Sequence, residues 1–224
     1  MSLKVLVIDV GGTHVKILAS GRRKRRQFSS GHGLSAAQMV LNVKTLAGDW
    51  KYDVVSIGYP GPVLHERIAA EPHNLGAGWV AFDFRAAFEC PVKLINDAAM
   101  QALGGYRGGR MLFLGLGTGL GSAFIVDGLV EPMELGHLPY RKETFEDYIG
   151  AHSLEKKKKR KWNKHVHAVI EQFRSALEPD DILIGGGNAR HILELPAGCR
   201  LGANADAFVG GFHLWPDSDN VRFR

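Results

Sequence analysis

Residues 5–17 read VLVIDVGGTHVKI, so an apolar stretch ends in an acid, two glycines and a threonine before a second apolar stretch begins. Two interpretations of this pattern are open. Gly11 and Gly12 permit a tight hairpin turn, with Thr13 beginning the return strand. Glycines without a Cβ atom also let backbone amides approach a phosphate closely, and Thr13 would add a hydroxyl. This stretch alone does not decide between a structural turn and a phosphate-binding turn.

Length and composition narrow the class of protein. With 224 residues, of which 45% are hydrophobic, the chain can bury one large core or two modest ones. No apolar run reaches the roughly 18 residues of a membrane span, and the first ten residues lack the pattern of a signal peptide. Cys90 and Cys199 are too few for a disulfide framework or a structural zinc site. We therefore expect a cytoplasmic protein with no membrane partner.

The net charge of +5 is concentrated in two basic runs, GRRKRRQ at residues 21–27 and EKKKKRKW at residues 155–162. Such runs are most often solvated loops or helix faces. They could instead attract a polyanion, such as a nucleic acid, polyphosphate or the phosphates of a nucleotide. Neither run interleaves aromatic residues, and we find no zinc-finger spacing and no clear helix-turn-helix, so no nucleic-acid partner is expected.

The hydrophobic pattern predicts strands that alternate with helices. Apolar residues at helical spacing predict a helix over residues 34–48, with Ser35 as its N-cap and Gly48 as its stop. Further helices are expected over 98–106, over 165–179 and near the end of the chain, and strands over 52–63, 91–97 and 180–187. Two similar strand–glycine turn–strand units, at the start and at residues 110–130, indicate two related α/β lobes. We expect lobes of residues 1–98, joined by a C-terminal helix at about 205–224, and of residues 99–204.

A second glycine cluster, GLGTGLGSA at residues 115–123, has more glycine than a hairpin needs. Each glycine adds conformational entropy that is lost on folding, so a loop that binds phosphate explains the cluster better than a flexible turn does. It is not a Walker A loop, because no GK[ST] follows. A third cluster, IGGGNAR at residues 184–190, is common in α/β proteins but would also let a purine or ribose lie against the backbone.

Polar residues stand at the ends of several predicted strands. Asn96 and Asp97 lie between an apolar strand and a helix, where they could cap the helix or face a ligand crevice. A carboxylate in such a crevice could accept the proton of a hydroxyl that attacks a phosphoryl group. Glu134, His137 and Glu146 are either ordinary surface residues or hydrogen-bond partners of sugar hydroxyls. Glu134 and His137 could also ligate a metal, although the HExxH pattern is absent.

In their order along the chain, these motifs resemble those of the ROK family (repressor, open reading frame, kinase), and most closely its polyphosphate glucokinase branch. The resemblance spans nearly the whole chain and rests on IDVGGTHVK, GYPGPV, EPHNLGAGW, IND, GLGTGLGSA, ELGH and DDILIGGGNAR. It implies a two-lobed actin-like ATPase/hexokinase (ribonuclease H-like) fold with a central cleft. The first glycine turn begins so near Met1 that the DNA-binding segment of the family's repressors is not expected.

The resemblance also implies an activity. It indicates a homodimeric, Mg²⁺-dependent kinase that transfers a phosphoryl group from polyphosphate, ATP or both to the 6-hydroxyl of glucose. Another hexose such as mannose, or binding of sugar or polyanion without catalysis, remains the alternative.

By position, the resemblance assigns Asp97 as the base that takes the proton of the sugar hydroxyl. The residues implied to hold the sugar are Asn96, Asp97, Glu134, His137, Glu146, Gly61 and Asn74. Those implied to face the phosphoryl donor are Asp9, Gly11, Gly12, Thr13, Lys16, Gly117, Thr118 and Gly119, with Gly186, Gly187 and Asn188 at the adenosine. Asp9 would also hold Mg²⁺, through water. Most ROK kinases carry a cysteine-rich zinc motif after the GH pair. This motif is absent here, so no structural zinc is expected. The assignment of Glu146 then depends only on the short motif FEDY at residues 145–148.

Overall fold

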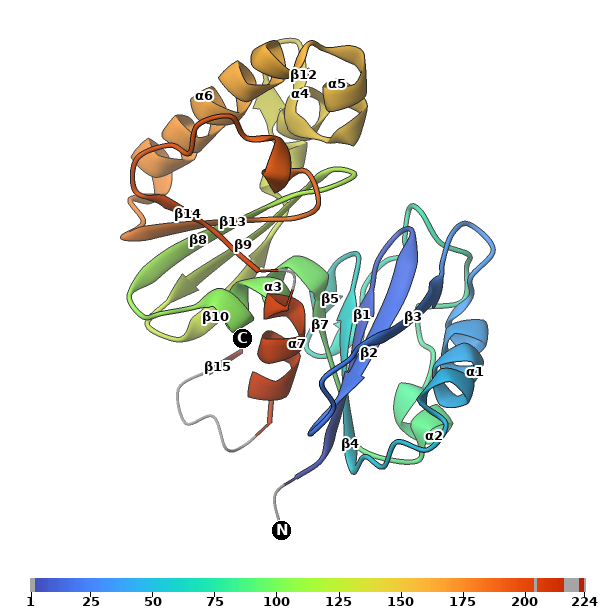
Figure 1. Ribbon diagram of the computed structural model, residues 1–224. Helices are drawn as coiled ribbons and strands as arrows, with labels where there is room; N and C mark the ends of the chain where they lie inside the picture. Colours follow the sequence, from blue (N-terminus) through green and yellow to red (C-terminus); the bar gives the residue numbers. More distant parts are fainter. Residues whose placement is uncertain (1–2, 204, 216–221, 224) are drawn as a thin grey trace. The chain divides into compact units, whose positions relative to one another are not determined.

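The computed structural model describes residues 3–203, 205–215 and 222–223 (Figure 1). The chain divides into two compact units. Unit 1 comprises Met1–Gly104 and Ala207–Asp219, and unit 2 comprises Gly105–Asp206 and Asn220–Arg224. The predicted lobes, 1–98 with about 205–224 and 99–204, stay a prediction. Residues 216–221 and 224 of the predicted C-terminal segment lie outside the described residues.

Unit 1 is built on a five-stranded sheet in the order β3-β2-β1-β4-β7. Its strands are β1 (Val5–Val10), β2 (His14–Ala19), β3 (Arg26–Ser29), β4 (Val54–Tyr59) and β7 (Val92–Asn96). Strands β1, β2 and β3 pair antiparallel, whereas β1 and β4, and β4 and β7, pair parallel. The predicted opening hairpin is confirmed. One detail differs: β5 (Val63–Leu64) begins where the predicted strand 52–63 ends, and its partner β6 (Arg67–Ile68) is not predicted, because two-residue strands are too short to show alternation.

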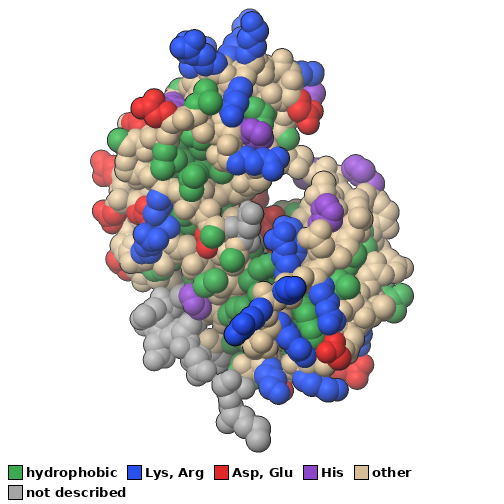
Figure 2. Space-filling view, in the orientation of Figure 1, with side chains coloured by type: hydrophobic (Ala, Val, Ile, Leu, Met, Phe, Trp, Pro, Cys, Tyr) green, Lys and Arg blue, Asp and Glu red, His purple; other side chains and the backbone are tan. Residues whose placement is uncertain are grey.

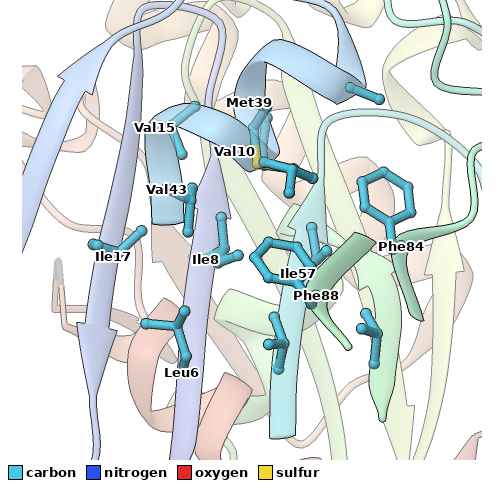
Figure 3. Close-up of a cluster of buried hydrophobic side chains, with 14 of the residues drawn as sticks. Leu6, Ile8, Val10, Val15, Ile17, Met39, Val43, Ile57, Phe84 and Phe88 are labelled. Carbon is cyan, nitrogen blue, oxygen red and sulfur yellow. The ribbon is translucent and has the colours of Figure 1, made fainter. Parts of the chain in front are cut away.

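Helices cover both faces of this sheet. On one face, α1 (Ala36–Ala47) and α2 (Phe84–Phe88) bury a core with the strands. Figure 3 shows Met39 of α1 pointing toward Val10 of β1 and Val43 of α1 pointing toward Ile8 of β1. The predicted cap of α1 is confirmed, because the side chain of Ser35 accepts a hydrogen bond from the amide of Gln38. On the opposite face lie α3 (Asp97–Gly105) and α7 (Asp206–His213).

The first basic run is partly structural. Arg26 donates to the carbonyl oxygens of Leu46 and Ala47 at 2.7 and 3.0 Å, which are groups that the end of α1 leaves unpaired. Arg22 and Arg26 also pair with Asp49, at 3.5 and 3.1 Å. The rest of the run, residues 23–25, is exposed, so the interpretation as a solvated loop fits these three cations, whereas Arg22 and Arg26 have structural partners.

Unit 2 repeats the sheet of unit 1. Its order is β14-β13-β8-β9-β10-β15, from strands β8 (Arg110–Leu116), β9 (Leu120–Val126), β10 (Leu129–Met133), β13 (Asp181–Gly185), β14 (Cys199–Leu201) and β15 (Arg222–Phe223). Strands β8, β9 and β10 pair antiparallel, while β8 and β13, and β13 and β14, pair parallel. The run β10-β9-β8-β13-β14 therefore has the same order and directions as β3-β2-β1-β4-β7. The repeat suggested by the two glycine-turn units is a repeat of topology.

Short elements and one long helix complete unit 2. They are η1 (Leu135–His137), β11 (Pro139–Tyr140), β12 (Glu143–Thr144), α4 (Phe145–Ile149), α5 (Ala151–Lys156), α6 (Lys159–Leu177) and η2 (Ala189–His191). The predicted start of α6 at residue 165 is wrong. Lysine and arginine are good helix formers, so the basic run continues the helix back to Lys159. No helix in the described ranges has the length and apolar character that a membrane crossing requires.

Two helices of unit 1 cross at glycines. A Cβ atom on Gly210 of α7 would overlap the carbonyl oxygen of Met100 in α3 and would lie 2.9 Å from the amide nitrogen of Gly104. On the same helix, a Cβ atom on Gly211 would overlap the side chain of Val7 in β1. Close packing of α7 on α3 and on the sheet therefore requires glycine at both positions.

We expect Gly210→Ala to lower the free energy of unfolding by about 1–3 kcal/mol or more, because the added methyl group meets backbone atoms that cannot rotate away. Urea denaturation followed by circular dichroism measures the change. Val209→Ala, at an exposed neighbour, is the control and should stay within about 0.5 kcal/mol of the parent. Equal stability of the parent and Gly210→Ala would contradict this account of the crossing.

Candidate functional site

Three parallel strands of unit 1 end at one edge of its sheet. Asp9 of β1 is in register with Gly58 of β4, and Gly58 is in register with Ile95 of β7. Neighbouring strands lie about 4.8 Å apart, so the residues that follow them form one row. That row consists of the first glycine turn (Gly11, Gly12, Thr13), then Gly61, then Asn96 and Asp97. Within unit 1 the structure thus places Asp97 at the same sheet edge as the first glycine turn.

The first glycine turn is a hairpin, as the structural interpretation has it. The amide of Gly11 donates to the carbonyl oxygen of His14 at 3.0 Å, and Ser30 Oγ donates to the carbonyl oxygen of Gly11 at 2.6 Å. Neither Gly11 nor Gly12 has a positive φ. A Cβ atom on Gly12 would meet only Asn74, at 3.6 Å, so the fold itself leaves room for a side chain at that position. The hairpin leaves the phosphate-binding interpretation of the same turn open.

Asp9 and Lys16 form a cross-strand ion pair beside this turn. They are direct partners on β1 and β2, and Lys16 Nζ lies 3.0 Å from Asp9 Oδ2. The Asp9 side chain is only 15% exposed. Its carboxylate oxygens are of the type that Mg²⁺ prefers, and Mg²⁺ is commonly bound by one or two carboxylates together with water and substrate phosphates. Asp9 therefore fits a water-mediated magnesium ligand, although Lys16 now holds one of its oxygens.

Asn96 acts as the helix cap that the structural interpretation expects. Its Oδ1 accepts from the amide of Ala99 at 3.0 Å, and its Nδ2 donates to the carbonyl oxygen of Gly61 at 3.1 Å. The residue is buried, with 7% exposed. Asp97 is the first residue of α3 and is partly exposed, and its Oδ1 accepts from the adjacent amide of Ala98 at 2.8 Å. Asn96 thus joins the Gly61 turn to the helix that begins at Asp97.

Unit 2 presents the equivalent edge. Gly115 of β8 is in register with Gly185 of β13, so the second glycine turn (Gly117–Gly119) and the segment Gly186–Asn188 follow adjacent parallel strands. Asn188 Nδ2 donates to the carbonyl oxygen of Gly117 at 2.9 Å. The structure thus brings together all six residues that the sequence assigns to the donor in this half of the chain.

The glycines of this edge are of two kinds. Gly186 has φ +82° and a Cβ atom there would overlap the backbone of Leu116, so the fold requires glycine. Gly117 has no positive φ, and no atom of the described residues lies within 4 Å of its Cβ position. Among the described residues, no hydrogen bond uses the amides of Thr118 and Gly119. Open space above Gly117 and amides without a protein acceptor are features that an incoming anion would use.

Glu134, His137 and Glu146 gather beside the second glycine turn. His137 lies between the two acids, with Nδ1 at 3.9 Å from Glu134 Oε2 and Nε2 at 3.7 Å from Glu146 Oε1. A Cβ atom on Gly119 would overlap Glu146 Oε2. The three predicted sugar ligands of unit 2 are therefore one cluster of exposed or half-exposed side chains. No group of three or more His, Cys, Asp and Glu suited to a metal was found in the described ranges.

Sequence reasoning missed the residues that hold α4 and Glu146 in place. Buried His165 of α6 contacts Tyr140 through its Nδ1, 3.3 Å from the Tyr140 hydroxyl. The rings of Tyr140 and Tyr148 lie 5.0 Å apart and meet edge to face, and the ring of Phe145 stacks on Tyr140 at 5.1 Å. In the sequence, His165 stands on the apolar face of a predicted helix. That position suggests burial but does not predict which residues it contacts.

Burial lowers the pKa of His165 below its usual value, and the charges of Lys157, Arg141 and Lys161 lower it further. The unfolded chain therefore binds the proton more readily than the folded one. We expect this site's contribution to stability to be complete above about pH 7 and to be lost as the pH falls below about 6.5 toward the lower pKa of the folded state.

Urea denaturation between pH 8 and pH 5 tests this expectation. As the pH is lowered, the unfolding free energy of His165→Gln should fall less than that of the parent. That of His152→Gln, at an exposed histidine, should fall as much as that of the parent. The same pH dependence in the parent and in His165→Gln would refute the assignment.

Comparisons with known proteins agree with this architecture. The family model described as ROK family matches residues 5–150. A polyphosphate glucokinase of Mycobacterium tuberculosis is 28% identical over 207 residues, covering 82% of this chain and 77% of that protein. The inorganic polyphosphate/ATP-glucomannokinase of Arthrobacter sp. strain KM has a TM-score of 0.80 at 24% identity, covering 94% of this chain and 97% of that one. A ROK family glucokinase of Streptomyces griseus, solved with glucose and AMPPNP, has a TM-score of 0.76 at 16% identity, covering 96% and 99%.

The structural likeness confirms the predicted actin-like ATPase/hexokinase fold. The family match, residues 5–150, includes the sheet edge of unit 1, the second glycine turn and the Glu134–Glu146 cluster. The predicted resemblance, near the polyphosphate glucokinase branch, is confirmed as well. This chain therefore belongs to the ROK family.

Proposed function

We propose that the protein is a sugar kinase that transfers a phosphoryl group from ATP or polyphosphate to the 6-hydroxyl of glucose. The observation that carries the proposal is the row of polar residues at the sheet edge of unit 1, where Asp97 follows β7 and the first glycine turn follows β1. The equivalent edge of unit 2 bears the second glycine turn beside Asn188. The named relatives, a polyphosphate glucokinase and a glucomannokinase, support the same activity.

Asp97 is proposed as the general base. As the sugar oxygen attacks the terminal phosphorus, the bridging P–O bond of the donor breaks and the hydroxyl proton passes to the Asp97 carboxylate. Such positioned proton transfer is worth about 10²–10⁴-fold in rate. Asn96 fixes the start of α3 through Ala99 and Gly61, so it orients Asp97 and has one remaining amide hydrogen for the sugar.

The remaining sugar ligands are proposed from the two units separately. In unit 1, Gly61 and Asn74 border the same sheet edge, and Asn74 contacts the Gly12 position. In unit 2, Glu134, His137 and Glu146 offer carboxylate and imidazole groups that can fork hydrogen bonds to neighbouring hydroxyls. Mannose is the leading alternative substrate, because a structural relative is a glucomannokinase.

Each glycine turn is proposed to bind donor phosphate through its own backbone amides, with Thr13 and Lys16 adding a hydroxyl and a positive charge in unit 1 and Thr118 a hydroxyl in unit 2. Asp9 would hold Mg²⁺ through water. When bound, the ion neutralises charge that develops on the transferred phosphoryl group. Gly186, Gly187 and Asn188 would border the adenosine of ATP. A homodimer, a cytoplasmic location and the lack of a structural zinc stay predictions.

The second basic run is proposed as the track for polyphosphate. Figure 2 shows Lys and Arg side chains gathered over α5 and the start of α6. Lys158 precedes α6 without a side-chain cap, and the first turn of the helix contains no acid. Because cations at a helix N-terminus are unfavourable, this concentration of charge costs stability, and an anionic chain would relieve it.

We expect Asp97→Asn to lower the turnover rate for glucose about 10²–10⁴-fold, because the base is lost while the side-chain size is kept. A coupled assay for glucose 6-phosphate with ATP and with polyphosphate measures it. Asp83→Asn is the matched control: Asp83 caps α2 in the same unit, and asparagine caps equally well. Turnover by Asp97→Asn near that of the parent would exclude the proposed base, and a parent without turnover on any hexose would favour a non-catalytic sugar- or polyanion-binding protein.

We expect charge reversal of Lys156, Lys158 and Lys159 to glutamate to raise the KM for polyphosphate and to leave the KM for ATP unchanged. Lys157 is spared, because its Nζ lies 4.2 Å from the centre of the Tyr148 ring. Acids at positions 158 and 159 favour the start of α6, which offsets the unfavourable acid at position 156 at the end of α5, so folding should be retained. The same reversal of Arg23, Lys24 and Arg25, the exposed part of the first run, separates the two runs. Equal losses with both donors, or a parent that does not use polyphosphate, would contradict the track.

A further inference from the structure

The buried side of α6 holds the segment that follows β13. Asn163 is 6% exposed, and its Nδ2 donates to the carbonyl oxygens of Lys159 and His191, both at 3.0 Å. Its Oδ1 accepts from the amide of Leu193 at 2.8 Å. One turn later, His167 Nε2 lies 2.9 Å from the carbonyl oxygen of Glu194. Side chains on two adjacent turns of α6 therefore contact the backbone of residues 191–194.

The other end of the same segment is tied to the second glycine turn. The Asn188 amide donates to the carbonyl oxygen of Leu116 at 2.9 Å, and its side chain donates to that of Gly117 at 2.9 Å. The amide of His191 donates to the carbonyl oxygen of Asn188, also at 2.9 Å. Residues 188–193 are thus hydrogen-bonded to the second glycine turn at one end and to α6 at the other.

Helix packing alone would favour an apolar side chain at position 163. Apart from His165, the other buried positions of α6 are hydrophobic, namely Trp162, Val166, Val169, Ile170 and Phe173. A buried amide gains little over an apolar side chain unless its hydrogen bonds are complete. Asn163 uses both amide hydrogens and its oxygen, and two of the three bonds go to one short segment. Its contribution is therefore to the position of that segment.

We propose that Asn163 is a positioning residue for the nucleotide donor, acting through His191 and Leu193 on the segment Gly186–Asn188. The inference rests on the proposed function, which assigns that segment to the adenosine of ATP. Polyphosphate has neither base nor ribose, so its use should not depend on this segment. The exposed side of the same turns carries Lys159, Arg160, Lys161 and Lys164. One helix would then serve the two donors from opposite sides.

The test is Asn163→Asp, which keeps size and the acceptor for Leu193 but places a carboxylate oxygen against the carbonyl oxygen of His191. We expect the KM for ATP and the Kd of a non-hydrolysable ATP analogue to rise about tenfold, with the KM for glucose and for polyphosphate within about twofold of the parent. His167→Ala, which removes the next contact at a half-buried position, should give a smaller change of the same kind.

Ile125→Ala is the control for general destabilisation. Ile125 is fully buried in β9 of the same unit, so the variant loses stability without touching residues 188–194. An ATP-specific change in Asn163→Asp that Ile125→Ala does not reproduce supports the inference. Unchanged ATP affinity, or parallel losses for ATP, glucose and polyphosphate, overturns it.

Binding of the ATP analogue keeps this test separate from the proposed function. If the parent phosphorylates no hexose, the proposed function fails, and the analogue's affinity for the parent and for Asn163→Asp still decides the inference. A parent that does not bind the analogue overturns the inference directly.

Discussion

Parallel strand pairing is the constraint on which the rest of the structure depends. The ladders of β1 with β4 and β4 with β7 place Asp9, Gly58 and Ile95 in one register. Every residue that follows these strands must then emerge at the same edge of the sheet. The ladder of β8 with β13 does the same for Gly115 and Gly185 in unit 2. Backbone hydrogen bonds inside the sheets, rather than contacts among the polar side chains, therefore bring the candidate residues together within each unit.

Residues at these edges serve the fold and the proposed chemistry at once. Asn96 caps α3 and anchors the Gly61 turn, and this network orients the neighbouring Asp97. Glycine likewise has two separate physical roles. At Gly186 the backbone conformation and the closeness of Leu116 exclude any side chain, whereas at Gly117 the surroundings are open. Gly117 is therefore the stronger indication of a ligand, because neither backbone conformation nor close packing requires glycine there.

The start of α6 combines features that oppose each other energetically. Its buried side anchors three segments of unit 2 through Trp162, Asn163 and His165, whose polar atoms reach Ile149, His191 and Tyr140. Its exposed side places cations next to the positive end of the helix dipole, which weakens the helix locally. Tertiary anchoring offsets that cost, so the charge is tolerated in the folded protein. The helix is thereby available for an anionic partner without depending on one for its structure.

The sequence by itself determined the elements and their chemistry. Apolar runs and glycine turns were sufficient to predict the hairpins and the caps Ser35 and Gly48, because these depend on residues near one another in the chain. Motif order likewise identified the family. Tertiary structure alone decided that Asn188 supports Gly117, that Asn163 holds residues 191–193 and that His165 contacts Tyr140, all pairs more than twenty residues apart in the chain. Those contacts depend on strand register and helix packing, which join distant segments and leave no periodic signal in the sequence.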